Sequence, residues 1–118
     1  MEGKKKAILI AEEDGNITEI DLDIHPKKNE IVRHLKGTAT FIGAIPEMDI
    51  VIMKCDRSPF DLMLNRNNLP PPFDDEVIRG PILMVRMDEN SEHQDLTLPE
   101  VEPMLRGSKP LLSTSLPN

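Results

Sequence analysis

The sequence predicts an α+β fold, with a mainly antiparallel sheet of about five or six strands, one amphipathic helix packed on the sheet and a short C-terminal helix. Three observations support this prediction. Several short β-prone runs are separated by turns rich in Gly, Pro and Asp. Residues 26–37 show a helical spacing of apolar side chains, and a helix-start motif begins at Thr97.

The chain of 118 residues has the size of one ordinary domain and can bury a single core. We assign residues 1–107 to one α+β domain. Residues 108–118 contain Pro and Ser with little periodicity, which predicts a flexible C-terminal tail.

Residues 5–23 predict a β-hairpin. Two β-prone runs flank Asp14-Gly15-Asn16, where Gly and Asn tolerate the positive φ angles of tight hairpins. In the second run, apolar side chains at positions 20, 22 and 24 alternate with acidic ones at positions 19, 21 and 23. This alternation indicates a strand with one face on the core and the other in water.

The segment HPKKNEIVRHLKG, residues 25–37, predicts a short amphipathic helix of about three turns. Pro26 suits the first helical position, and Gly37 can adopt the left-handed conformation that ends a helix. Because Ile31, Val32 and Leu35 fall on one helical face, we expect this helix to lie across the sheet.

Residues 38–46, 49–55 and 60–64 are three β-prone runs separated by turn formers, which predicts a meander. The run 50–53 is continuously apolar, as in a central strand covered on both faces. After a proline-rich loop, residues 82–85 are apolar in the same way and follow Pro81, which predicts an inner strand.

The last element is a short helix after residue 97. Thr97 and Glu100 match a capping box, in which the glutamate reaches back to the threonine amide. The helix then runs through Val101 and Leu105. We expect Pro103 to disturb it and the glycine at position 107 to close it.

Charge and composition restrict the partners. The formal net charge of −7 and the presence of only three aromatic side chains oppose direct binding to nucleic acid or to anionic membranes. No apolar run predicts a membrane span or a secretion signal. The single cysteine, Cys55, leaves no internal disulfide and fits a reducing compartment. We therefore expect a cytoplasmic protein, in a host cell or in a virion.

No catalytic, cofactor or metal motif is recognisable. Cys55 has an arginine nearby that could favour the thiolate, but no base is linked to it by a known signature. A cysteine at a strand end is usually a small buried hydrophobe. Asp88, Asn90 and Glu92 imitate the opening of a calcium loop, but His93 stands where such a loop needs glycine. The sequence predicts no catalytic residue, cofactor or metal.

The loop LNRNNLPPPFDDEVIRG, residues 64–80, is the candidate contact with a protein partner. Its amide and guanidinium side chains can bond locally or to another molecule, and residues 70–72 form a stiff polyproline segment. In the alternative reading, the prolines only connect strands, and the flanking apolar side chains fold back onto the core. The candidate contact residues are Asn65, Arg66, Asn67, Asn68, Leu69 and Phe73.

The order of these segments resembles an uncharacterised family of short proteins, a domain of unknown function found in phages, plasmids and large DNA viruses of algae. The resemblance covers about residues 5–106 and depends on Asn65-Arg66, on Gly80 before an apolar strand and on DLTL at residues 95–98. The chain departs from the family pattern in its three prolines at 70–72 and in Lys36-Gly37, where a glycine pair is common. The resemblance implies a viral or mobile-element origin and no site residue.

The leading hypothesis is a small intracellular, non-enzymatic interaction domain that binds a protein partner or forms a homo-oligomer. Two alternatives are a minor structural component of a virion and an enzyme with a thiol or carboxylate reaction near Cys55. A third is an acidic inhibitor that mimics nucleic-acid charge and blocks a basic host protein. An apolar sheet face left uncovered would indicate dimerisation or a partner. The acidic residues of the inhibitor hypothesis are Glu19, Asp21, Asp23, Asp74, Asp75 and Glu76.

Overall fold

The structure is a computed structural model that describes residues 4–11, 16–55, 65, 69, 73 and 78–107. It confirms the predicted α+β class. The strands are β1 (Lys4–Ile10), β2 (Ile17–Asp23), β3 (Ala39–Ile45), β4 (Ile50–Cys55), β5 (Ile82–Met87) and β6 (His93–Gln94). The helices are η1 (Pro26–Lys28), α1 (Glu30–Leu35), η2 (Pro46–Met48) and α2 (Leu98–Gly107), where η marks a 3₁₀ turn.

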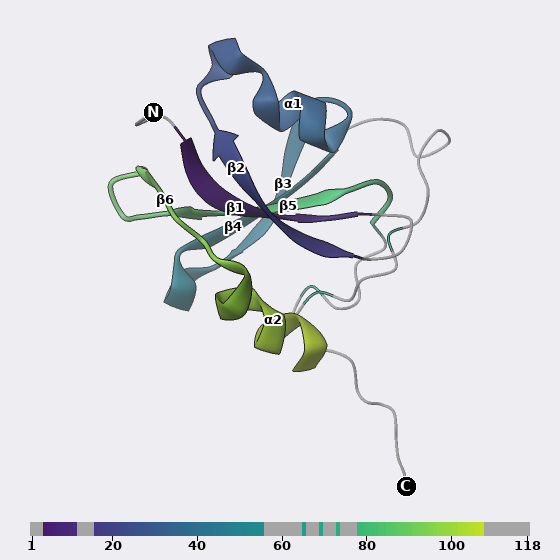
Figure 1. Cartoon of the computed structure of the whole chain (residues 1–118), viewed down its shortest axis with the longest axis vertical. Coiled ribbons are helices and arrows are strands. Elements are labelled where there is room, and N and C mark those ends of the chain that lie inside the picture. The colour runs from purple at the N-terminus through teal and green to yellow at the C-terminus, as the bar shows by residue number, and fades with distance from the viewer. Residues whose placement is uncertain are drawn as a thin grey trace, which may run out of the picture.

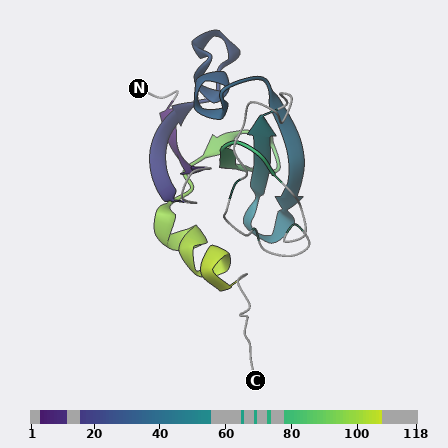
Figure 2. The same ribbon diagram turned by 90° about the vertical axis from the view of Figure 1, so that its right-hand side faces the viewer.

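The strands form one antiparallel sheet in the order β2-β1-β5-β4-β3, and β6 pairs with the end of β5. β5 is therefore the central strand, between the hairpin β1–β2 and the hairpin β3–β4. Figure 1 shows α1 and α2 on opposite sides of this sheet. In Figure 2 the sheet is curved, with β2 and β3 at its two edges.

Most strands lie where the sequence predicts them. The hairpin β1–β2 pairs residue by residue from Lys4 with Asp23 to Ile10 with Ile17. The inner strand predicted after Pro81 is β5, whereas the run 60–64 lies outside the described residues. The two-residue strand β6 was not predicted, because two polar residues carry no strand periodicity.

The predicted three-turn helix is shorter in the structure. The chain forms η1, then Asn29 adopts a left-handed conformation with φ 57°, and α1 spans only six residues. The Glu30 carboxylate accepts hydrogen bonds from the Asp23 amide at 2.9 Å and from Lys4 Nζ at 2.7 Å. These bonds tie the start of α1 to β2 and β1, so the chain turns sharply at Asn29. Lys36, with φ 66°, takes the C-terminal position expected for Gly37.

The two faces of the sheet carry separate cores, which we call the α2 face and the α1 face. The α2 face has the larger core, because α2 and residues 69 and 78 cover it. That core consists of Ile8, Ile10, Ile50, Ile52, Leu69, Ile78, Ile82, Met84, Leu96, Val101 and Leu105. The α1 face buries Ala7, Leu22, Leu35, Cys55, Leu83 and Val85.

The start of α2 is fixed by carboxylates. Glu100 Oε1 accepts hydrogen bonds from the Thr97 amide and hydroxyl, each at 2.9 Å, which confirms the predicted reach-back of the capping box. Glu19 Oε1, on the edge strand β2, accepts the Leu98 amide at 2.8 Å. The helix continues through Pro103 to Gly107, so this proline does not end it.

Arg86, near the end of β5, joins three parts of the α2 face. Its guanidinium donates to the carbonyls of Met48 at 3.1 Å and Asp95 at 2.9 Å. It also forms an ion pair with Glu100 at 3.0 Å. Arg86 therefore holds η2, the segment after β6 and α2 against the central strand.

Replacing Arg86 by alanine should lower the free energy of unfolding by about 2 kcal/mol, because partly buried backbone and carboxylate acceptors lose a charged donor. Urea unfolding followed by circular dichroism measures this change. Arg33→Ala is the matched control, since the Arg33 side chain is 65% exposed and its ion pair with Glu30 is 4.0 Å long. The control should cost less than about 1 kcal/mol. Equal losses in the two variants would contradict this role for Arg86.

Candidate protein-binding surface

The α1 face is only partly covered. The only helix packed on it in the described part of the chain is α1, whose six residues contact β2, β3, β4 and β5. Around its small core, a ring of apolar side chains stays partly accessible. These are Leu9, Ile20, Ile24, Ile31, Ala39, Val51, Met53 and Met87.

A hollow of about 180 Å³ lies between α1 and the strands of this face, and we call it the apolar hollow. Ile24 and Ile31 line it on the side of β2 and α1, and side chains of β4 and β5 line the rest. All its lining side chains are aliphatic or thioether groups, so it offers shape and apolar contact with no side-chain hydrogen bond. The lining residues are Ile24, Ile31, Val51, Met53, Val85 and Met87.

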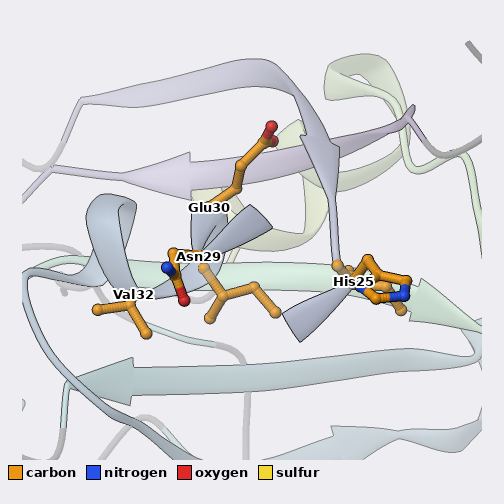
Figure 3. Close-up of a pocket in the computed structure, with 6 residues that line it drawn as sticks. His25, Asn29, Glu30 and Val32 are labelled. Carbon is orange, nitrogen blue, oxygen red and sulfur yellow. The ribbon is translucent and has the colours of Figure 1, made fainter. Parts of the chain in front are cut away.

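A second pocket of about 310 Å³ adjoins the hollow at the start of α1, and it shares Ile24 and Ile31 with it. His25, Asn29, Glu30 and Val32 complete its lining (Figure 3). Val32 is 44% exposed beside this opening. The two pockets together extend the apolar surface from the centre of the sheet to the surface of α1.

Phe41 extends the same surface to the edge of the sheet. It lies directly opposite Met53 in the β3–β4 pairing, so both side chains belong to the α1 face. Phe41 is 62% exposed, which is unusual for a large aromatic side chain. A bulge between Phe41 and Gly43 follows immediately.

Glu30 is the main charged group in this region, and it is already paired. Lys4 Nζ and the Asp23 amide bond its two oxygens, and Arg33 lies 4.0 Å away. The hydrogen bond from Lys4, then that from Asp23, lowers the pKa of Glu30 despite its burial. These bonds favour the ionised carboxylate, which anchors α1.

His93 is an unsatisfied polar group beside Met87, one of the residues that line the hollow. It pairs with Met87 across β5 and β6, so its side chain shares the α1 face. Both ring nitrogens are buried, and neither has a hydrogen-bond partner in the described part of the chain. Burial lowers the pKa of His93, and Lys5 lowers it further, whereas Asp95 and Asp23 oppose the shift.

The structure turns the described members of the predicted contact loop toward the protein. Asn65 is 8% exposed, and its Nδ2 donates to the carbonyls of Ile10 at 3.2 Å and Gly80 at 2.9 Å. Leu69 is 2% exposed in the core of the α2 face. Phe73 packs against that core, as the alternative reading expected.

Arg66, Asn67 and Asn68 lie outside the described residues, so a partner contact through them stays a prediction.

The candidate reactive groups are also used within the fold. Cys55 is 3% exposed in the core of the α1 face, which confirms its reading as a small buried hydrophobe. Asp88 accepts the amides of Asn90 and Glu92, each at 2.9 Å, and so closes its own loop. Among the described residues, no group of three or more His, Cys, Asp or Glu side chains could hold a metal ion.

The acidic row on β2 also has partners inside the chain. Glu19 accepts the Leu98 amide, Asp21 forms an ion pair with Lys6 at 3.1 Å, and Asp23 accepts the His25 amide at 3.0 Å. Asp74, Asp75 and Glu76 lie outside the described residues.

Sequence reasoning missed the apolar hollow. Its lining comes from α1, β4, β5 and the residue that follows β2, and β4 and β5 meet this part of the chain only through the strand order. The available signal was indirect. Continuous apolar runs at 50–53 and 82–85 indicate strands covered on both faces, but the sequence predicts only one short helix before residue 97.

Comparisons with known proteins give one match. A family model described as "Family of unknown function (DUF5880)" matches residues 8–104. No curated protein and no solved structure matches the chain. In the described part of the chain, no helix has the length and apolarity needed to cross a membrane.

Replacing His93 by phenylalanine should make the protein less sensitive to mild acid. Because the pKa of His93 is lowered in the fold, the unfolded chain binds a proton more readily than the folded chain. The wild type should therefore lose stability as the pH falls through about 6.5, the ordinary histidine pKa. Urea unfolding at pH 8 and pH 5.5 should show that the free energy of unfolding of the variant rises relative to that of the wild type at the lower pH. The same difference in free energy of unfolding between variant and wild type at both pH values would refute this role of His93.

Replacing Glu30 by glutamine should destabilise the protein near neutral pH, with a smaller effect in acid. The lowered pKa of Glu30 means that its stabilisation is present above about pH 4.5 and is lost as the pH falls further. Thermal unfolding at pH 7 and pH 3 measures both effects. Glu47→Gln is the matched control, because Glu47 is exposed on η2. This control should change the unfolding temperature little at either pH.

Proposed function

We propose that the chain, which belongs to the DUF5880 family of unknown function, is a small non-enzymatic protein-interaction domain that binds its partner at the apolar hollow. The observation that carries this proposal is the hollow of about 180 Å³ on the α1 face, together with the adjoining pocket at α1. A well-packed domain rarely leaves such a space beside its own core.

The lining of the hollow suits a protein partner. An apolar cavity of roughly 150 Å³ can hold a benzene ring, so the hollow has room for one large apolar side chain. Met53 and Met87 are flexible and can adapt their shape to an inserted group. The exposed side chains of Val32 and Phe41 would extend the contact beyond the hollow.

The way the polar groups are used supports a non-enzymatic role. Glu30 is held by Lys4 and Asp23, and His25 Nδ1 accepts the Lys27 amide at 3.2 Å. A general acid or base must be free to exchange a proton with a substrate. These two groups instead maintain the path of the chain into α1.

The apolar surface is a better candidate than the acidic one. Glu19, Asp21 and Asp23 are occupied by bonds within the chain, which weakens the proposal of an inhibitor that mimics nucleic-acid charge. The net charge of −7 favours a protein partner over nucleic acid. An intracellular location, in a host cell or as a minor virion component, is supported by the single cysteine and by the resemblance of the sequence motifs to viral and mobile-element proteins.

Met87→Glu tests the proposal, because it places a carboxylate in the lining of the hollow. The immobilised wild-type chain should capture a partner from a cell lysate, and this variant should not capture it. Calorimetry with the identified partner should show at least tenfold weaker binding to the variant. The reason is that a buried partner side chain would have to desolvate the new charge.

Thr40→Glu is the control, because it adds the same charge on β3 at a position opposite Lys54, on the other face of the sheet. It should leave capture unchanged, and circular dichroism should show both variants folded. Equal capture by the wild type and folded Met87→Glu would rule out the hollow as the binding surface.

A further inference from the structure

Building on the proposed function, we propose that the occupant of the apolar hollow is a second copy of the chain, which forms a two-fold symmetric dimer. The charges on the two sides of the hollow favour this occupant. One side is basic and the other acidic, although the chain as a whole is acidic.

The basic side, which we call the basic lip, consists of Lys27, Lys28 and Arg33, all exposed. It belongs to η1 and α1, and it lies close in sequence to Ile24 and Ile31, which line the hollow. The only acidic residue of this segment is Glu30, which is buried and neutralised by Lys4. Arg33 also lies 4.0 Å from Glu30, so the net positive charge of the lip comes mainly from Lys27 and Lys28.

The acidic side, which we call the acidic lip, consists of Glu47, Asp49 and Glu89, all exposed. These residues lie just before β4 and just after β5, close to Val51 and Met87 of the lining. The Met87 amide donates to the Asp49 carbonyl at 2.8 Å, so the two strand ends are held together. No lysine or arginine occurs at residues 45–49 or 87–92.

A two-fold axis through the hollow makes this arrangement self-complementary. In an isologous dimer, residue i of one chain meets residue j of the other, and the same contact occurs twice. The basic lip of each copy would then face the acidic lip of its partner, while the apolar side chains, including Val32, meet near the axis. Any other partner would need a matching dipole of its own, whereas a second copy has it by construction.

The net charge of the chain opposes dimerisation. Two copies with a formal charge of −7 each repel at long range, so association requires local complementarity. Salt screens both the repulsion and the attraction between the lips, so a salt titration alone does not separate them. Charge reversal of each lip distinguishes the repulsion from the attraction. Both reversals disrupt the pairing between the lips, but one makes the net charge more negative and the other makes it less negative.

The experiment uses two double variants of the full chain, Lys27→Glu with Lys28→Glu and Glu47→Lys with Glu89→Lys. The first takes the formal charge from −7 to −11, and the second takes it from −7 to −3. Sedimentation equilibrium should show a dimer for the wild type and at least tenfold weaker dimerisation for each variant alone. The second variant is decisive, because net repulsion alone would make it dimerise more strongly than the wild type.

An equimolar mixture of the two variants should restore the dimer, because each reversed lip then faces a lip of opposite charge. Thr40→Glu should dimerise like the wild type, and Met87→Glu should be monomeric. A wild type that is monomeric at all concentrations, a mixture that stays monomeric, or a dimer that persists in Met87→Glu would each overturn the inference. If the wild type is monomeric while Met87→Glu still abolishes capture of another protein, the dimer is excluded and the proposed function stands.

Discussion

The structure depends on the burial of the first four residues of β5 between two hairpins. These residues, from Ile82 to Val85, are at most 2% exposed, and the strand pairs with β1 on one side and β4 on the other. Burying one such side chain contributes about 1.5–3 kcal/mol, and side chains of this strand enter both cores. β5 is the strand that links the hairpin β1–β2 to the hairpin β3–β4 in one sheet. Arg86, near the end of the strand, also holds α2 through its ion pair with Glu100.

The unequal cover of the two faces follows from how each helix begins. α2 starts from a capping box and runs for ten residues, so it can cover one face with help from Leu69 and Ile78. α1 starts at Glu30, whose carboxylate is tied to two strands, and it ends after six residues. A helix of that length cannot cover a sheet of this width. The apolar hollow is the part of the α1 face that is left over.

The sequence predicted local features well, because they depend on neighbouring residues. The alternation in β2, the apolar run of β5 and the Thr97–Glu100 cap are all visible within a few positions. The length of α1 was predicted wrongly, since the bond between Lys4 and Glu30 joins residues 26 positions apart. Asn65 was predicted as a candidate contact residue, and the structure shows its amide donating to the carbonyl of Ile10, 55 positions away. The hollow needed the strand order, which no local pattern encodes.

The contact between Gly43 and Phe73 has a consequence for how sequences of this family can vary. A Cβ added at Gly43 would overlap the Phe73 ring, so the absence of a side chain on β3 is what lets this ring pack on the sheet. We therefore expect the two positions to vary together. A relative with alanine or a larger residue at position 43 needs a smaller side chain at position 73 or a displaced ring there. Covariation between these two positions would therefore report whether the side chain at position 73 keeps its place on the sheet across the family.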